Sequence, residues 1–513
     1  MSEKYNVLFI ISDQHRADHL SCAGNEVLKT PNLDKLASQG VRFTNAFCTN
    51  PMCMPNRATL LTGLYPNVHG VRSNGMIMSR EIPTITDTLV DKGWHTAAFG
   101  KLHHQFNTPP YRIGDKSAES FHDWVFPKKG EYPVRENFPI PYYGYQEVET
   151  VIGHGPCLTG HYMNWLEERA PELAESMRER WDDIDNFFSV FCEHDLPKDL
   201  YSTKYVEERT IAFLERHARG EYGDKPFYVH SSFPDPHQPV CPPGKYRELY
   251  NPDDVFLPDN FDDLENLCEH PFLAPYLNVF PGAMLRETNE KEVKQFIAWT
   301  YGTIALIDHS IGQILASLDK LGYADNTIVI YTSDHGDLMG EHGLLFKGPA
   351  PFEGVFNVPL IFRAPEINPN TVTDALIASI DLPKTILSML DIRERYHPPN
   401  MQGKDYTEVL RDPSKEVKDC ILIENDEEVG PKGPLYVRLR HLITKEYKLT
   451  VYEDKNKNLE HYGDLFNRKK DPGELNNLWI KDSMESLKLK LVNKLLHKNL
   501  QAQSRFPKRI AGT

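Results

Sequence analysis

The sequence predicts an α/β fold, in which a large, mixed but mostly parallel sheet is flanked by helices and followed by a smaller α+β domain. Two observations lead to this prediction. Three short apolar runs, of the kind buried on both faces of a parallel sheet, lie far apart at residues 6–12, 226–232 and 327–332. Segments with helical spacing lie between them, and such alternation of strands and helices is typical of α/β proteins.

Each of the three apolar runs ends in polar side chains that can take part in chemistry. Asp13 and Gln14 follow the first run, His237 lies shortly after the second, and Asp334 and His335 follow the third. Ligands of open α/β sheets bind at the carboxyl ends of the strands. The sequence therefore predicts a functional site where these three ends meet.

The remaining elements divide the chain into two predicted domains. A catalytic domain is expected over residues 1–380, with helices at 32–39, 84–92, 205–219 and 291–321. Stretches near 105–200 and 240–290 are rich in Pro, Asp, Glu and aromatics with little periodicity, which predicts insertions over the site. A smaller domain is expected over 381–513, with helices at 381–390 and 482–498 and strands at 421–424, 436–442 and 447–451.

The composition of the chain indicates which partners and which cellular compartment to expect. The 513 residues carry a net charge of −16, which disfavours binding to nucleic acid. The sequence contains no run of 18 apolar residues, so no membrane-spanning helix and no membrane partner are expected. The eight cysteines form no C-x-x-C pair, and the start of the chain lacks the pattern of a secretory signal. We therefore expect a cytoplasmic protein with reduced thiols.

Residues 53–57 carry the strongest functional motif of the chain. They read C-x-P-x-R and run directly into A-T-L-L-T-G-L-Y-P at 58–66. On residue type alone, Cys53 could also be a buried free cysteine in a proline-bent loop. The motif resembles that of the type I sulfatases of the alkaline phosphatase superfamily. The resemblance implies an alkaline-phosphatase-like fold, and a Cys53 that a formylglycine-generating enzyme oxidises to formylglycine, whose hydrated aldehyde is the nucleophile.

Further motifs extend the resemblance over most of the chain. Residues 332–343 read T-S-D-H-G-D-x-x-G-E-H-G, residues 100–103 read G-K-x-H, and residues 236–239 read P-H-x-P. Near the end, residues 462–466 and 471–478 are similar to the Y-D-L and D-P-x-E-x-x-N-L segments of the family.

The resemblance implies a divalent metal ion held by a set of five residues. Gln14 stands where the family has a second aspartate, so this site has one negative charge fewer. Calcium is usual in sulfatases, and the lower charge together with an imidazole makes Mn²⁺ its rival. Considered singly, an aspartate at such a position could instead cap a helix or begin a turn. The implied metal ligands are Asp13, Gln14, Cys53, Asp334 and His335.

The resemblance also implies a set of catalytic side chains around Cys53. Arg57 would stabilise the hydrated aldehyde, and Lys101 would neutralise a sulfate oxygen. His103 would help to collapse the covalent intermediate. His237 would protonate the leaving oxygen, which Lys347 would also contact. Without the resemblance, Lys101 and His103 could form an exposed basic loop, and His237 could be a structural histidine.

Asn74 has two interpretations that the sequence leaves open. It lies where related phosphonate and phosphodiester hydrolases place an asparagine that donates to the substrate. It is also the first residue of Asn-Gly, which is a strong turn signal.

These motifs predict a hydrolase that cleaves aryl or alkyl sulfate esters to an alcohol and sulfate, with some phosphodiester and phosphonate cleavage. The main alternative is a phosphonate monoester or phosphodiester hydrolase, in which neutral side chains stand at the positions of Lys101 and His103. A choline-sulfatase-like preference and a non-catalytic metal-binding protein with unmodified Cys53 are further alternatives. A small anionic ester and the formylglycine-generating enzyme are the expected partners, and a homodimer or homotetramer is expected by analogy.

Overall fold

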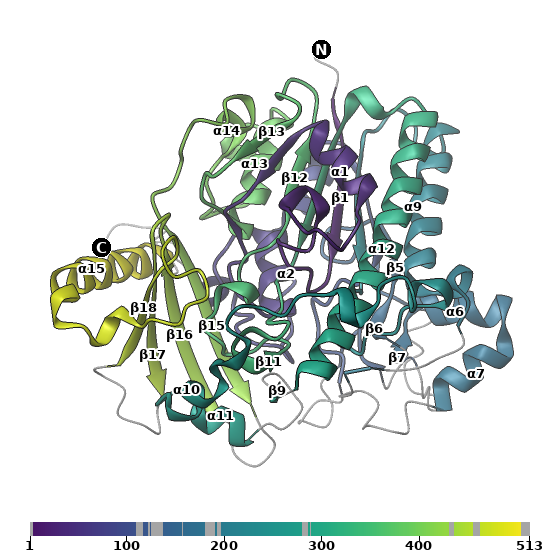
Figure 1. Cartoon of the computed structure of the whole chain (residues 1–513). Coiled ribbons are helices and arrows are strands. Elements are labelled where there is room, and N and C mark those ends of the chain that lie inside the picture. Colours follow the sequence, from purple (N-terminus) through teal and green to yellow (C-terminus); the bar gives the residue numbers. More distant parts are fainter. Residues whose placement is uncertain are drawn as a thin grey trace.

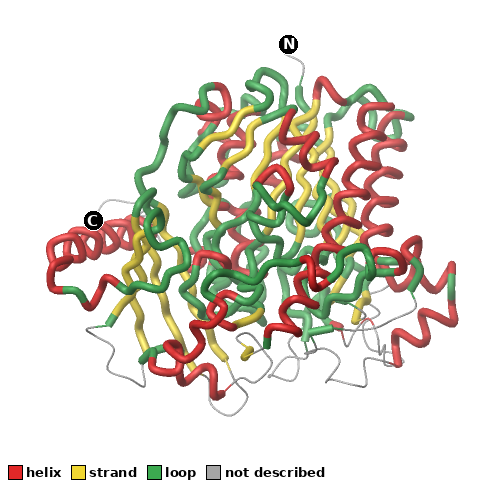
Figure 2. The backbone as a smooth tube through the Cα atoms, viewed as in Figure 1, coloured by secondary structure: helices red, strands yellow, loops and turns green. Residues whose placement is uncertain are grey.

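An eight-stranded sheet forms the centre of the protein, as the computed structural model shows (Figures 1 and 2). The structure describes residues 4–108, 116–121, 124, 137–155, 157–179, 190–191, 196–279, 286–287, 289–429, 435–454 and 462–503. The strand order is β13-β2-β12-β10-β1-β8-β4-β5. In chain order these strands are β1 (Asn6–Ser12), β2 (Val41–Phe43), β4 (His95–Gly100), β5 (Glu147–Thr150), β8 (Phe227–Phe233), β10 (Thr327–Ser333), β12 (Leu360–Arg363) and β13 (Thr371–Thr373).

The sheet is mixed but mostly parallel, as predicted. Strand β1 pairs in parallel with β10 on one side and with β8 on the other. The pairs β8–β4, β4–β5 and β2–β13 are also parallel. Only β12 runs against its neighbours β10 and β2 within the described residues. The predicted fold class is therefore confirmed.

Helices cover both faces of this sheet because the strands are apolar on both sides. In β1, Leu8 and Ile10 pack into one hydrophobic core, whereas Val7, Phe9 and Ile11 pack into another. The first core contains side chains of α1 (Pro31–Ser38), α9 (Ser202–Ala218) and α12 (Glu290–Lys320). The second contains side chains of α2 (Cys53–Thr62), α4 (Ile85–Asp91) and α13 (Leu382–Met389). The strand is thus fully buried, which explains its uninterrupted apolar sequence.

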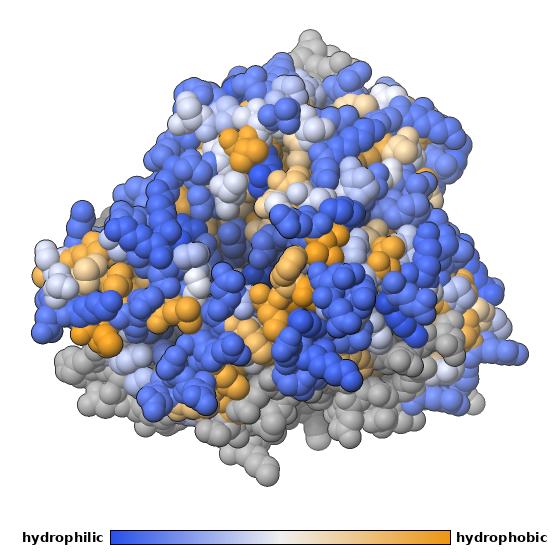
Figure 3. Space-filling view, viewed as in Figure 1, coloured by the Kyte–Doolittle hydropathy of each residue, from blue (hydrophilic) through white to orange (hydrophobic). Residues whose placement is uncertain are grey.

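The smaller C-terminal unit is an antiparallel sheet with one long helix, which matches the predicted α+β domain. Its strands are β15 (Ile421–Val429), β16 (Leu435–Ile443), β17 (Tyr447–Asp454) and β18 (Gly463–Asn467). Helix α15 (Glu485–Ala502) packs on this sheet through Leu491 and Leu495. Its outer face carries exposed leucines, and Figure 3 shows apolar side chains over this end of the molecule.

The C-terminal sheet contacts the segment 347–357 of the larger unit directly. The Nδ2 of Asn425 donates to the carbonyl oxygen of Gly348 at 3.1 Å. Arg468 pairs with Glu353, with an Nη2–Oε1 distance of 2.6 Å, and the backbone N–H of Glu353 donates to Glu474 at 2.8 Å. The two units therefore share an interface with buried and partly buried polar bonds. The boundary at 380/381 stays a prediction, and the core that contains α13 also continues into the C-terminal strands.

The two predicted insertions contain short regular elements that the sequence pattern did not indicate. Strand β5 lies inside the first stretch, yet it forms an edge of the main sheet. The first stretch also contains β6 (Ile152–His154), β7 (Cys157–Thr159), α6 (His161–Arg169) and α7 (Pro171–Glu179). The second contains α10 (Leu264–Glu269), α11 (Ala274–Val279) and β9 (Arg286–Glu287). The other short elements are β3 (Ala46–Phe47), α3 (Pro66–His69), β11 (Leu344–Leu345), β14 (Ile377–Ala378) and α14 (Thr407–Arg411).

The described helices include none that combines the length and the hydrophobicity needed to cross a bilayer. Seven of the eight cysteines lie in the described part of the chain, and no disulfide joins any two of these seven.

Candidate active site

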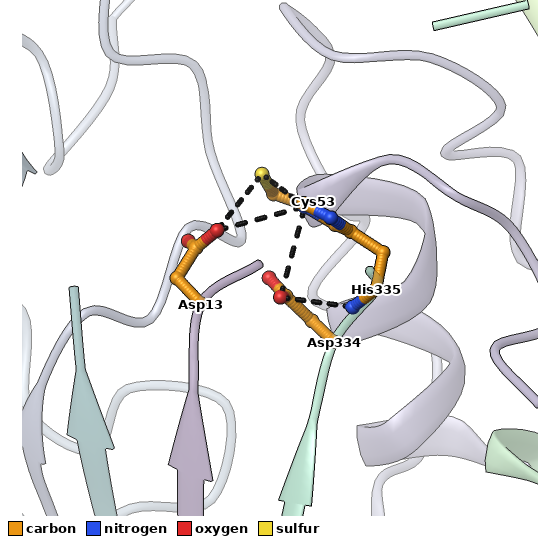
Figure 4. Close-up of side chains that lie close together, drawn as sticks. All are labelled: Asp13, Cys53, Asp334 and His335. Carbon is orange, nitrogen blue, oxygen red and sulfur yellow. Dashed lines mark hydrogen bonds and ion pairs between the residues drawn. The ribbon is translucent and has the colours of Figure 1, made fainter. Parts of the chain in front are cut away.

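Cys53 is the first residue of helix α2, and it lies at the carboxyl end of the central strands (Figure 4). Its side chain is buried, with 1% of its surface exposed. Asn56, one residue before the end of the motif, fixes this helix start. Its Nδ2 donates to the carbonyl oxygen of Asp334 at 2.6 Å, and its Oδ1 accepts the backbone N–H of Thr49 at 2.9 Å. The motif thus brings the thiol to the end of β10.

Four predicted metal ligands meet at this point. Because β1 and β10 end in register at Ser12 and Ser333, Asp13 and Asp334 follow side by side. One potential ligand atom from each of Asp13, Cys53, Asp334 and His335 lies within 4.8 Å of the others. The Nε2 of His335 lies 3.1 Å from the Sγ of Cys53 and 3.5 Å from the Oδ1 of Asp13 (Figure 4).

The chemistry of this cluster fits a divalent cation. Two buried carboxylates supply hard oxygen ligands, and His335 supplies one nitrogen. The Nδ1 of His335 lies 2.9 Å from the carbonyl oxygen of Gly336, to which only a protonated nitrogen can donate. Its Nε2 lone pair therefore faces the cluster. Burial lowers the pKa of His335 to about 4, so the ring is neutral, as a metal ligand must be.

Arg57 contacts the Oδ2 atoms of both carboxylates, whereas His335 lies near their Oδ1 atoms. Its Nε donates to the Oδ2 of Asp334 at 2.7 Å, and its Nη2 lies 3.3 Å from the Oδ2 of Asp13. Its Nη1 donates to the carbonyl oxygen of Lys101 at 2.7 Å and to the Oγ of Ser232 at 2.9 Å. The guanidinium is buried and each of its three nitrogens makes a hydrogen bond, so its position and that of both aspartates are coupled.

Two lysines complete a cationic shell around the thiol. The Nζ of Lys347 lies 3.4 Å from the Sγ of Cys53, and that of Lys101 lies 3.8 Å from it. Lys101 also pairs with Asp13. Burial alone would raise the pKa of Asp13, but Lys101, His237, Arg57 and Lys347 together hold it well below its usual value. Burial, with the charge of Asp13, raises the pKa of the Cys53 thiol.

His237 lies on the loop that follows β8, where the sequence placed it. The Nδ1 of its ring lies 2.6 Å from the carbonyl oxygen of Gln238, to which it donates. The loop is anchored by Asp235, whose carboxylate accepts the hydroxyls of Tyr201 at 3.0 Å and Thr203 at 3.0 Å. The start of α9 thereby holds the segment that carries His237.

Gln14 and Asn74 hold neighbouring groups in place. The Oε1 of Gln14 accepts a hydrogen bond from Lys347 at 2.6 Å, and its backbone N–H donates to the Oδ1 of Asp334 at 3.1 Å. The amide oxygen that could reach a metal is thus directed to a lysine. The Oδ1 of Asn74 accepts the backbone N–H of Met54 at 3.1 Å, which supports the start of α2.

His103 lies near this centre but differs from the other predicted residues in its contacts. Its backbone adopts a left-handed conformation, with a φ of 55°. Its backbone N–H donates to Glu119 at 2.6 Å, and its buried Nδ1 has no hydrogen-bond partner among the described residues. Among the described residues, no hydrogen bond joins the His103 side chain to Cys53. Its catalytic role stays a prediction.

Three residues of the centre, Gln238, Asp337 and His154, were not predicted from the sequence. The Nε2 of Gln14 donates to the Oε1 of Gln238 at 2.6 Å and also contacts Asp337. His154, at the end of β6, contacts the Nζ of Lys101 and stacks on the ring of His237. His154 lies in a stretch without periodicity, and a single histidine between two glycines gives no recognisable signal. Asp337 lies within the motif at residues 332–343, so the sequence did contain a signal for this residue.

The fold and the site together define a class of protein. A buried cysteine at a helix start, facing two carboxylates, an imidazole and three cations at the end of a mostly parallel sheet, is the centre of an anion-ester hydrolase of the alkaline phosphatase superfamily. The sulfatase family matches residues 5–392, and the C-terminal region of N-sulphoglucosamine sulphohydrolase matches residues 340–502. The chain belongs to the sulfatase family, and it is a sulfuric ester hydrolase.

Individual relatives span nearly the whole chain. It is 28% identical over 506 residues to an arylsulfatase of Clostridium perfringens, in an alignment that covers 98% of this chain and 95% of that protein. It is 31% identical over 405 residues to the multifunctional alkaline phosphatase superfamily protein PehA of Trinickia caryophylli, covering 75% and 73% of the two chains. Among solved structures, the phosphonate monoester hydrolase of Agrobacterium radiobacter aligns with a TM-score of 0.77 at 24% identity, covering 98% and 97%. At 24% identity, this structural similarity shows a shared fold.

Proposed function

We propose that the protein hydrolyses aryl or alkyl sulfate esters with a formylglycine derived from Cys53 and one divalent metal ion. One observation carries this proposal: the Cys53 side chain lies in a cluster with Asp13, Asp334 and His335, and two lysine ammonium groups lie within 4 Å of its Sγ. Such a site can hold a cation against the nucleophile and neutralise a bound anion at the same time. The expected partners remain a small anionic ester and the formylglycine-generating enzyme.

The residues present indicate how such a site would work. Asp13, Asp334 and His335 would hold the metal, which supplies a Lewis acid for the nucleophile and the sulfate oxygens. Formylglycine supplies a geminal diol, and the Sγ of Cys53 marks the place of its oxygens.

The remaining side chains have separate tasks. Arg57 fixes the two carboxylates, and we assign it the stabilisation of the nucleophile. The Nζ atoms of Lys101 and Lys347 lie 3.8 Å and 3.4 Å from the Sγ of Cys53, and we assign them the task of offsetting charge on the transferring group. His237 is assigned as the proton donor to the leaving oxygen. His103 is retained as the candidate base for release of sulfate.

Removal of the metal should abolish turnover reversibly. Chelation of the purified protein is expected to reduce the hydrolysis of an aryl sulfate to background. Addition of Ca²⁺ or Mn²⁺ should then restore it, because Asp13, Asp334 and His335 would again hold the Lewis acid that the reaction needs. Titration of each metal, followed both by activity and by thermal stability, would identify the better one. Full activity in a sample shown by elemental analysis to be metal-free would refute the metal proposal.

A phosphonate monoester or phosphodiester hydrolase is the second candidate, which the structural likeness to a phosphonate monoester hydrolase favours. Values of kcat/KM for an aryl sulfate, an aryl phosphonate monoester and an aryl phosphodiester would separate the two. We expect the sulfate to be preferred by at least about tenfold, because two ammonium groups match an anion that spreads its charge over three oxygens. Position 53 must first be verified as formylglycine by peptide mass. A preference for either phosphorus ester would replace the sulfatase proposal by the second candidate.

Two further proposals concern the setting of the enzyme. We propose a cytoplasmic location, which the lack of a disulfide among the seven described cysteines supports, because secreted proteins commonly form disulfides. We also propose a homodimer or homotetramer. The exposed side chains of Leu489, Leu496 and Leu500 on α15 support this assembly.

A further inference from the structure

We propose that His154 is a positioning residue of the catalytic centre, which orients both the Lys101 ammonium and the His237 ring. This inference rests on the proposed function, because it concerns the same reaction. His154 is the last residue of β6, in the hairpin formed by β6 and β7, and 8% of its surface is exposed.

The hairpin that carries His154 packs closely against the His237 loop. Gly155 follows His154 with a φ of +52°, and a Cβ at this position would lie 2.6 Å from the carbonyl oxygen of Pro239. Only glycine allows the two backbones to approach so closely. The position of His154 beside His237 is therefore set by the backbone and does not depend on a flexible side chain.

The first contact of His154 directs a charge toward the reaction centre. Its Nε2 contacts the Nζ of Lys101. An ammonium group only donates, so this nitrogen must be an acceptor and His154 must be neutral. Burial, together with the charges of His237 and Lys101, lowers the pKa of His154 well below its usual value, which agrees with this state. Lys101 is thus held between His154 and Asp13, with its Nζ 3.8 Å from the Sγ of Cys53.

The second contact fixes the plane of the predicted proton donor. The rings of His154 and His237 are stacked, with a centroid distance of 3.6 Å and an interplanar angle of 10°. The Nδ1 of His237 is already committed to the carbonyl oxygen of Gln238. With the ring plane set by the stack and the rotation set by this hydrogen bond, the Nε2 of His237 has one direction left. His154 therefore links the group that neutralises the substrate to the group that protonates its leaving oxygen.

The two contacts can be removed separately. His154→Phe keeps a flat ring against His237 and removes the acceptor for Lys101. His154→Gln keeps a polar side chain of similar reach for Lys101 and removes the stack. His161→Gln serves as a matched control, because His161 lies seven residues further along and bonds to Thr150. All three variants are compared with the wild type in a series of aryl sulfates whose phenols differ in acidity, after position 53 and the melting temperature of each have been checked.

The two variants should fail in different ways. His154→Phe is expected to lower kcat/KM by about 10²-fold for every ester, because a misplaced Lys101 weakens binding of the transferring group throughout the series. His154→Gln should change the best leaving group little and reduce the poorest by at least about tenfold, because only the latter needs a well-aligned acid. In a Lys101→Met background, His154→Phe should have almost no further effect.

Other results would overturn the inference. It fails if both folded variants match the wild type, if both lose activity equally at every leaving group, or if His154→Phe and Lys101→Met combine additively. If the wild type prefers an aryl phosphonate, the proposed function fails and the same series is run on aryl phosphonates. That series tests His154 by the same criteria.

Discussion

Replacing Cys53 by alanine should abolish sulfate ester hydrolysis and leave the fold intact. The thiol is the precursor of the proposed nucleophile, and its Sγ lies within 4 Å of Asp13, His335 and both lysines. Loss of a covalent nucleophile commonly costs on the order of 10⁶-fold in kcat. Alanine at the start of α2 removes only one buried atom, so we expect a loss of about 1 kcal/mol in the free energy of unfolding.

The measurement compares kcat/KM and the melting temperature of Cys53→Ala with those of the wild type. Cys48→Ala is the matched control, because Cys48 is equally buried and its Sγ contacts only the carbonyl oxygen of Val355, at 3.6 Å, among the hydrogen bonds of the described residues. The control should keep wild-type activity. Turnover by Cys53→Ala at the wild-type rate would disprove the role of Cys53. Peptide mass spectrometry of the wild type would show directly whether residue 53 is an aldehyde.

Replacing Arg57 by methionine should cause the second largest loss. The guanidinium bridges Asp13 and Asp334, and it is buried together with them. Its removal takes away a cation that stabilises the transition state, for which arginines in phosphoryl transfer contribute about 10³–10⁵-fold. It also removes an ion-pair partner from each of two buried carboxylates, and breaking a buried ion pair in this way costs about 3–5 kcal/mol.

Steady-state kinetics and thermal unfolding would separate the two effects. Arg57→Lys should recover part of the stability and little of the activity, because an ammonium cannot bridge the carboxylates as the planar guanidinium does. Arg440→Met is the control for loss of a largely buried arginine, since Arg440 pairs with Asp426 at 2.5 Å in the C-terminal sheet. If Arg57→Met keeps kcat/KM within about tenfold of the wild type, Arg57 has only a structural role.

The central elements could be predicted because their sequence pattern and their environment coincide. Strand β1 and strand β10 are buried along their whole length, and both have a continuous apolar run in the middle. Helix α12 has a long, periodic apolar face that predicted its bounds to within about a residue. Strand β4 was missed, because it contains histidine, threonine, alanine and glycine and owes its burial to its neighbours β8 and β5. Burial that comes from tertiary packing leaves no local pattern.

The site residues divide in the same way, into those marked by a short sequence motif and those placed only by tertiary packing. Cys53, Arg57, Asp13, Asp334 and His335 lie in short motifs next to predicted elements, and the structure brings all five together. The direction of a loop side chain is not contained in such motifs. His103 has a left-handed backbone and the Gln14 amide oxygen is directed to Lys347, and neither follows from spacing. His154 reaches the centre only because a hairpin distant in sequence packs there.

The contact between the C-terminal sheet and segment 347–357 has a consequence for how such enzymes can be recombined. Lys347 begins this segment, and the bonds from Asn425, Arg468 and Glu474 hold the residues that follow it. Both units of the protein therefore help to position Lys347 next to Cys53. A chimera in which only the smaller unit is exchanged would lose the matched contacts to the segment that follows Lys347. Engineering by module exchange has to transfer the segment and the sheet as one unit.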